Sequence, residues 1–147
     1  MPPTIKLSPS AAHRWLHCTP SAKLSATAPE LYQSRYAGAG TDAHALAEAK
    51  LKLEFGGAIR SKVQLKLEHA RKSEYYLEDP DLFEKNTDNY VNYIREIYND
   101  YEANGGVKAF LVEETVSLEG IFPRGIADCV IVSDMEMVVI DYKNGTG

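Results

Sequence analysis

Apolar residues recur every three to four positions in the first part of the chain, a spacing typical of amphipathic helices. Ser8-Pro9-Ser10 opens the first of these segments, and Thr41 is a suitable N-cap for the second, which Gly56-Gly57 ends. Asp79-Pro80-Asp81 breaks the chain and can cap the last, which ends at Asn104-Gly105-Gly106. The pattern predicts helices over residues 11–18, 41–55, 59–77 and 82–101, and a loop over the small residues 36–40.

After Gly106 the period of the apolar residues changes from that of a helix to that of a strand. Strands are predicted over residues 108–118, 127–133 and 137–142, with a hairpin turn over 133–136. The expected fold class is therefore α+β, with N-terminal helices followed by a three-stranded antiparallel sheet. We expect one domain over 1–147, made of an N-terminal segment 1–37, a helical region 41–103 and a β region 107–143.

Composition fits this expectation, since 147 residues correspond to about one domain, and 44% hydrophobic with 25% charged residues is typical of globular proteins. The net charge of -5 excludes a generally basic DNA-binding protein, but not a nucleic-acid enzyme with acidic metal ligands. No apolar run approaches the roughly 20 residues of a membrane span, and no secretory signal is visible. Cys18 and Cys129 lie far apart, so we expect a cytoplasmic protein without a disulfide framework or a membrane contact.

The most informative chemistry lies at the ends of the last two predicted strands. Antiparallel pairing brings Asp128 and Asp141 toward one end of the hairpin, where two carboxylates can share a cation such as Mg²⁺. Lys143 leaves the same face as Asp141 and could orient or deprotonate a metal-bound water, or neutralise charge on a phosphate. This chemistry suits phosphodiester hydrolysis. The alternative is a solvated acidic hairpin, because acid-x-Lys is a common pattern that Glu48-Ala49-Lys50 also matches.

Two further groups could support such a site. His44 and Glu48 lie four positions apart, so they share a helix face, either as a metal ligand and its helper or as a surface pair. Glu113 could point toward the hairpin and help to bind a metal, with Glu114 on the opposite face, or both could be exposed.

Basic and aromatic residues have two interpretations as well. The basic residues between Arg60 and Lys72 could follow a phosphate backbone or form a solvated helix face. Four tyrosines could stack on bases or, as we expect, pack in the core: Tyr90, Tyr93, Tyr98 and Tyr101.

Four segments together resemble the RecB-like branch of the PD-(D/E)XK nuclease superfamily, and most of all its phage and prophage proteins. They are Ser8-x-Ser10-x-x-His13-Arg14-Trp15-x-x-Cys18, Gly40-Thr41-x-x-His44-x-x-x-Glu48, Gly125-x-Ala127-Asp128 and Asp141-Tyr142-Lys143-x-Gly145. The resemblance implies a metal-dependent DNA nuclease with a restriction-endonuclease-like core. It implies that His44, Asp128, Asp141 and the Tyr142 carbonyl bind Mg²⁺ or Mn²⁺, that Lys143 acts on the attacking water, and that Glu113 and Glu48 support the site.

The sequence departs from the family pattern after Lys143, where the closing helix and strand of the family core are missing. We therefore expect the N-terminal portion of a nuclease fold, and self-association or a protein partner that covers the incomplete sheet. Cys18 matches one ligand of the iron–sulfur cluster that several relatives bind, but the other three ligands are absent, so no cluster is expected. Cys129 is predicted to lie in the core. The alternative to a nuclease is a non-catalytic, phage-encoded inhibitor or regulator that binds a protein.

Overall fold

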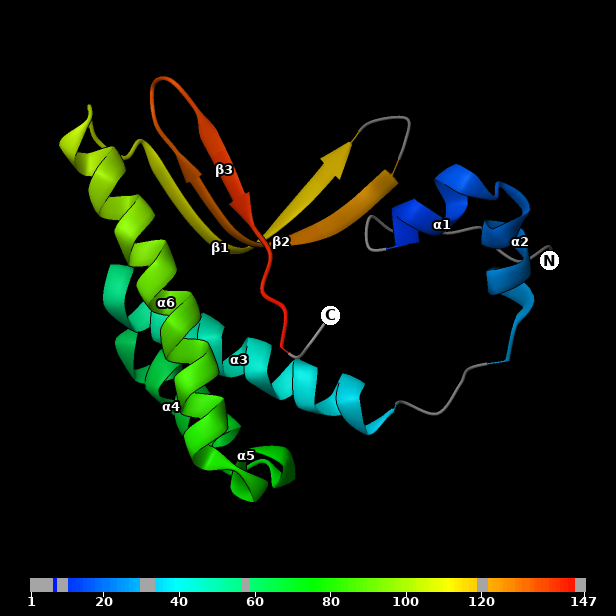
Figure 1. Ribbon diagram of the computed structural model, residues 1–147, viewed down its shortest axis with the longest axis horizontal. Coiled ribbons are helices and arrows are strands. Elements are labelled where there is room, and N and C mark those ends of the chain that lie inside the picture. The colour runs from blue at the N-terminus through cyan, green and yellow to red at the C-terminus, as the bar shows by residue number, and fades with distance from the viewer. Residues whose placement is uncertain (1–6, 8–10, 30–33, 57–58, 119–121, 145–147) are drawn as a thin grey trace. The chain divides into compact units, whose positions relative to one another are not determined.

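The computed structural model describes residues 7, 11–29, 34–56, 59–118 and 122–144. The chain divides into two compact units, one from residues 1–32 and 114–127 and the other from residues 33–113 and 128–147. The expected fold class is confirmed, because helices come first and a three-stranded antiparallel sheet follows (Figure 1). Within the described ranges, no helix combines the length and the apolar character that crossing a membrane requires.

In the first unit, two short helices occupy the described N-terminal residues. Helix α1 spans Ala12–His17 and agrees with the predicted helix over 11–18. Helix α2 spans Pro20–Thr27 and begins with a proline, whose fixed φ suits a first helical position. The predicted Ser8-Pro9-Ser10 cap lies outside the described residues.

Helix α3, Arg35–Phe55, is longer than predicted. The loop expected over 36–40 and the Thr41 N-cap are both wrong: Ser34 caps the helix by accepting a hydrogen bond from the Ala37 N–H, and the Thr41 hydroxyl donates back to the Ala37 carbonyl. Gly38 is needed for packing and not for a turn, because a Cβ there would lie 2.6–2.7 Å from the tip of the Tyr75 ring. The predicted end is confirmed, with Gly56 at a φ of 84°.

The single helix predicted over 59–77 is two helices, α4 (Arg60–Ala70) and α5 (Glu74–Glu78). The break comes from Ser73, whose hydroxyl accepts a hydrogen bond from the Tyr76 N–H and so caps a new helix. Helix α6, Pro80–Ala103, begins as predicted, with the Asp79 carboxylate accepting from the Leu82 N–H.

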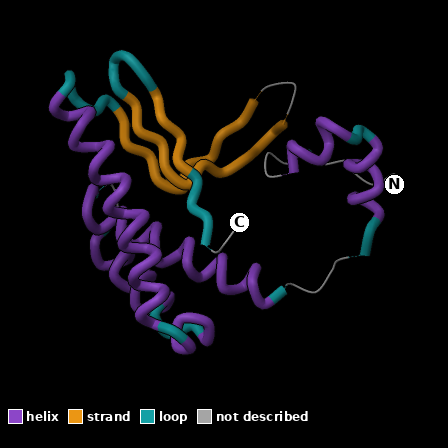
Figure 2. The backbone as a smooth tube through the Cα atoms, in the orientation of Figure 1, coloured by secondary structure: helices purple, strands orange, loops and turns teal. Residues whose placement is uncertain are grey.

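The sheet has the order β1-β2-β3, from β1 (Ala109–Leu118), β2 (Phe122–Val132) and β3 (Met137–Ile140). Strands β2 and β3 form the predicted hairpin, with Cys129 opposite Ile140 and Val132 opposite Met137. The turn is closed by a 2.9 Å hydrogen bond from the Ser133 N–H to the Glu136 carbonyl. The tube in Figure 2 shows β3 running straight from this turn toward the C-terminal segment.

Two clusters of buried side chains join the elements of the second unit. One lies mainly between α3, α4 and α6, and includes Leu46, Leu67 and Phe83. The other packs β2 and β3 against α3 and α6 through the residues Leu51, Val91, Ile94, Tyr101, Cys129, Ile131 and Ile140. The predicted core position of Cys129 is confirmed, and this packing holds β2 and β3 against α3 and α6.

Candidate metal centre

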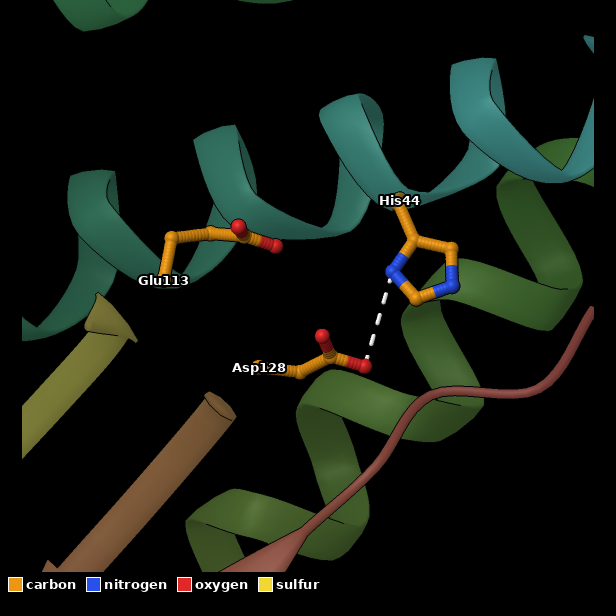
Figure 3. A group of neighbouring side chains, drawn as sticks. All are labelled: His44, Glu113 and Asp128. Carbon is orange, nitrogen blue, oxygen red and sulfur yellow. Dashed lines mark ion pairs between the residues drawn. The ribbon is translucent and has the colours of Figure 1, made fainter. Parts of the chain in front are cut away.

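Three side chains from three elements meet in the second unit (Figure 3). His44 comes from the middle of α3, Glu113 from β1 and Asp128 from β2, and each offers one ligand atom within 4.8 Å of the others. All three are partly buried. Antiparallel strands and a helix that packs against them therefore bring together residues that are far apart in the sequence.

The Asp128 carboxylate connects the helix to the sheet. Its Oδ2 atom lies 3.5 Å from Nδ1 of His44 and accepts a 2.7 Å hydrogen bond from the Tyr142 backbone N–H. The Tyr142 ring also contacts the His44 ring edge-on, with centroids 5.1 Å apart. The Asp128 carboxylate and the Tyr142 ring thus hold the His44 imidazole on two sides. A carboxylate has about four acceptor positions, so Asp128 keeps some of them for a ligand.

Glu113 reaches the group through an unusual backbone conformation. Its φ is 56°, the only positive value among the described non-glycine residues. Val112 packs against the second hydrophobic cluster, so its side chain faces the helices. Glu113 lines a cavity together with residues of α3, so its side chain faces the helices as well. Two successive residues of β1 therefore face the same side, which breaks the normal alternation of a strand. Glu114, predicted to point to the opposite face, is exposed. A strained residue of this kind is common at binding sites.

The acidic groups around Glu113 change the pKa of its carboxyl group. Burial raises the pKa of Glu113, and the Asp128 and Glu48 carboxylates raise it further, while His44 lowers it. Negative charges this close to one another favour a bound cation, because a cation removes the repulsion between them.

A small cavity of about 10 Å³ lies at the group, which is roughly the space of one water-sized particle. Its walls include Tyr90 and Tyr142, whose hydroxyl oxygens are buried and have no hydrogen-bond partner. Burial raises the pKa of both hydroxyls, and for Tyr90 nearby charges, the Asp128, Asp141 and Glu113 carboxylates among them, raise it further. A buried hydroxyl without a partner costs about 1–3 kcal/mol, so these two groups mark a place where a polar ligand would be stabilised.

The predicted helper Glu48 also lines this cavity, but its carboxylate is already engaged. Its Oε1 atom accepts from Lys52 at 2.5 Å and from Lys66 at 3.2 Å. Burial acts to raise the pKa of Glu48, yet the two lysines outweigh it and lower the pKa below its ordinary value. Glu48 therefore stays charged beside the centre without being one of the converging ligands.

Asp141 and Lys143 form a pair of their own. The Lys143 ammonium lies 2.5 Å from Oδ2 of Asp141, and both side chains are largely exposed. This hydrogen bond raises the pKa of Lys143. The structure does not bring Asp141 into the group of three, although the β2–β3 register continued by one residue places it opposite Asp128. Tyr142, expected to contribute its carbonyl, contacts Asp128 through its N–H.

Comparison with known families adds one result. Residues 5–147 match the model of the family described as protein of unknown function DUF2800. The chain belongs to the DUF2800 family. No solved structure matches the chain. The match leaves the chemistry of this DUF2800 member to be inferred from its own residues.

For this DUF2800 member, sequence reasoning identified the three converging side chains individually but missed Tyr90, which was expected only to pack. The periodicity of α6 shows that Tyr90 faces inward, but not that it lines a cavity beside acidic groups with its hydroxyl unpartnered. The thiols of Cys18, which is exposed, and Cys129, which is buried, are both free. Burial and the adjacent Asp128 raise the pKa of Cys129 to about 12, so this thiol stays protonated beside the site.

Proposed function

We propose that this DUF2800 member is a metal-dependent DNA nuclease that hydrolyses phosphodiester bonds at the His44, Glu113 and Asp128 centre. The observation that carries the proposal is the convergence of one imidazole and two carboxylates, from α3, β1 and β2, within 4.8 Å. The orphaned tyrosine hydroxyls at the same cavity support it, because they need a polar ligand to satisfy them.

The donor set fits a divalent ion with a preference for oxygen ligands. Carboxylates suit Mg²⁺ and Mn²⁺, and an imidazole nitrogen adds affinity for a transition metal, so Mn²⁺ should bind more tightly than Mg²⁺. When bound, such an ion polarises a phosphoryl oxygen and makes a coordinated water more acidic. His44, Glu113 and Asp128 would hold it, with Asp141 as a further carboxylate beside Asp128.

The protein's own residues would each have a separate role. Asp128 orients the His44 ring, and the Tyr142 N–H in turn fixes Asp128. Lys143 places a positive charge next to Asp141, where it can stabilise the negative charge that develops on a phosphate. The side chain of Lys143 is 81% exposed, so a strand bound from solvent could contact it while it stays paired with Asp141.

The resemblance to the RecB-like PD-(D/E)XK nucleases supports the same proposal. The residues that carry the resemblance include His44, Asp128, Asp141 and Lys143, and the first two belong to the group that converges. The β-hairpin that carries the acidic residues is also the element in which that family places its metal ligands.

Cleavage of plasmid DNA tests the proposal. With Mn²⁺ or Mg²⁺ we expect the wild-type chain to cut, and Asp128→Asn and Lys143→Ala to be slower by about a hundredfold or more. Glu114→Gln, a neighbour of Glu113 with an exposed side chain, is the matched control and should cut normally. Full activity of Asp128→Asn, or no cleavage by the wild type with either metal, would contradict the proposal.

A protein-binding role is the second candidate, and one feature of the sheet favours it. Strand β3 is at an edge of the described sheet, and its Met137 and Val139 side chains are 65% and 56% exposed. An apolar edge of this kind can pair with another chain. A stable complex with a protein partner, formed equally well by Asp128→Asn, together with the absence of cleavage, would favour this role over the nuclease.

A further inference from the structure

The second unit contains a much larger cavity that the proposed centre does not use. It measures about 440 Å³ and lies between α3, α4 and the turn that follows α4. Cavities of this size are typical of sites for small organic groups. Its lining is mostly apolar, and Glu48 belongs to its wall as well as to the wall of the metal cavity. The two cavities are therefore neighbours that share one side chain.

The apolar part of the wall is open to a ligand. Ala45 and Ala70 line it, and beside them Leu65 is 66% exposed although it sits on a helix that packs against α3. Ala70 is buried, so the exposed Leu65 and the half-buried Ala45 supply the apolar surface that a planar ring could cover. Nucleobases extruded from a stack bind against apolar side chains in this way.

The polar part of the wall carries side chains of both charges. Lys66, His69 and Lys72 line the cavity, and all three are exposed. Asp42 and Glu48 line it too, and because the Glu48 carboxylate accepts from Lys66 as well as from Lys52, Lys72 is the lysine of the wall without an ion pair among the described residues. A wall that combines an apolar surface with an unpaired lysine complements a nucleotide, whose base is planar and whose phosphate is anionic.

We propose that the cavity between α3 and α4 binds one unpaired nucleotide of a DNA strand, with its base on Leu65 and Ala45 and its phosphate at Lys72. The inference rests on the proposed nuclease function, because it places the next part of the strand at the centre beyond Glu48. A base inside a duplex cannot enter a cavity, so the substrate is single-stranded DNA or a frayed end.

Binding measurements separate this proposal from its alternatives. The probe is a fluorescent thymidine oligonucleotide of about 12 nucleotides, compared with a hairpin duplex, in Ca²⁺ and at several salt concentrations. The wild type should bind the single strand more tightly. Lys72→Gln should weaken binding and reduce the slope of log affinity against log salt by about 0.7. Lys62→Gln, an exposed lysine of α4 outside the cavity, should leave the slope unchanged.

Leu65→Ser tests the base contact, and its exposure makes unfolding unexpected. It should weaken binding of the single strand about fivefold or more without changing the salt slope. Leu77→Ser, an equally exposed leucine of α5, should have no effect. Equal binding of hairpin and single strand, or identical behaviour of Lys72→Gln and Lys62→Gln, would overturn the proposal.

The outcome also distinguishes the two proposals from each other. If the wild type cleaves DNA in an Asp128-dependent way and the cavity variants bind like the wild type, the nucleotide site is wrong and the nuclease stands. If the wild type neither binds nor cleaves DNA, the nuclease proposal fails and the nucleotide site fails with it.

Discussion

Glu84→Gln is predicted to weaken the packing of α3, the helix that carries His44 of the candidate centre, against the helices around it. The Glu84 carboxylate of α6 accepts hydrogen bonds from Arg71 and Tyr76, each at 2.8 Å, and lies 2.6 Å from the Lys50 ammonium of α3. Lys50 is only 12% exposed, so its charge depends on this partner and on Asp88. One carboxylate thus connects α3, α5, α6 and the segment between α4 and α5.

The pKa of Glu84 gives the size of the effect. Burial acts to raise it, but the hydrogen bonds from Arg71, Lys50 and Tyr76 outweigh burial and lower the pKa from 4.5 to about 2. At about 1.4 kcal/mol for each tenfold change in proton affinity, this corresponds to roughly 3 kcal/mol of stability. The side chain is 27% exposed, so solvent screens the interaction only in part.

Urea unfolding of Glu84→Gln and the wild type measures this contribution. Because the folded pKa is lowered, the stabilisation is complete above about pH 4.5 and is lost as the pH falls toward about 2. The variant should therefore lose roughly 3 kcal/mol at pH 7 and progressively less below pH 4.5. Glu96→Gln, an exposed glutamate of the same helix, should change stability by less than about 0.5 kcal/mol. Equal effects of the two variants, or a loss that does not depend on pH, would refute the reasoning.

Three further predictions concern packing and the centre. Gly40→Ala should stabilise the chain by about 0.5–1 kcal/mol, because nothing lies within 4 Å of the new Cβ. Gly38→Ala should be less stable than Gly40→Ala, since its Cβ meets the Tyr75 ring. Equal urea midpoints of the two variants would contradict this. Cys18 should react with a thiol reagent in the native protein and Cys129 only after unfolding; fast reaction of both would show that Cys129 is not buried. Tyr90→Phe should raise the stability of the metal-free protein by about 1–3 kcal/mol, because it removes a buried hydroxyl without a partner, and should weaken Mn²⁺ binding; a loss of stability would contradict it.

The fold was largely accessible from the sequence where periodicity and caps agree. The stripe of α6, the turn at Ser133 and the core position of Cys129 all follow from patterns that burial and backbone geometry impose locally. The predictions were wrong where a contact with a distant part of the chain, and not the local sequence, decides the structure. Gly38 looks like a loop residue, but its missing side chain lets α3 approach Tyr75, and nothing near it in the sequence shows that contact.

The candidate centre could be predicted only in part, again because contacts between distant segments decide its geometry. His44 and Asp128 stand out by residue type and position, and the structure places them 3.5 Å apart. Strand alternation alone does not predict that Val112 and Glu113 both face the helices, because this requires a positive φ at Glu113, a conformation that local propensity disfavours. The separate pairing of Asp141 with Lys143 also depends on side-chain geometry that the sequence does not contain.

Titration of the metal-free chain with Mn²⁺, followed by electron paramagnetic resonance, tests the centre most directly. The account predicts one bound Mn²⁺ per chain, with affinity reduced at least about tenfold in Glu113→Gln and in Asp128→Asn. Glu114→Gln should bind like the wild type. Absence of binding by the wild type, or equal binding by Glu113→Gln and Glu114→Gln, would contradict a metal centre at this position.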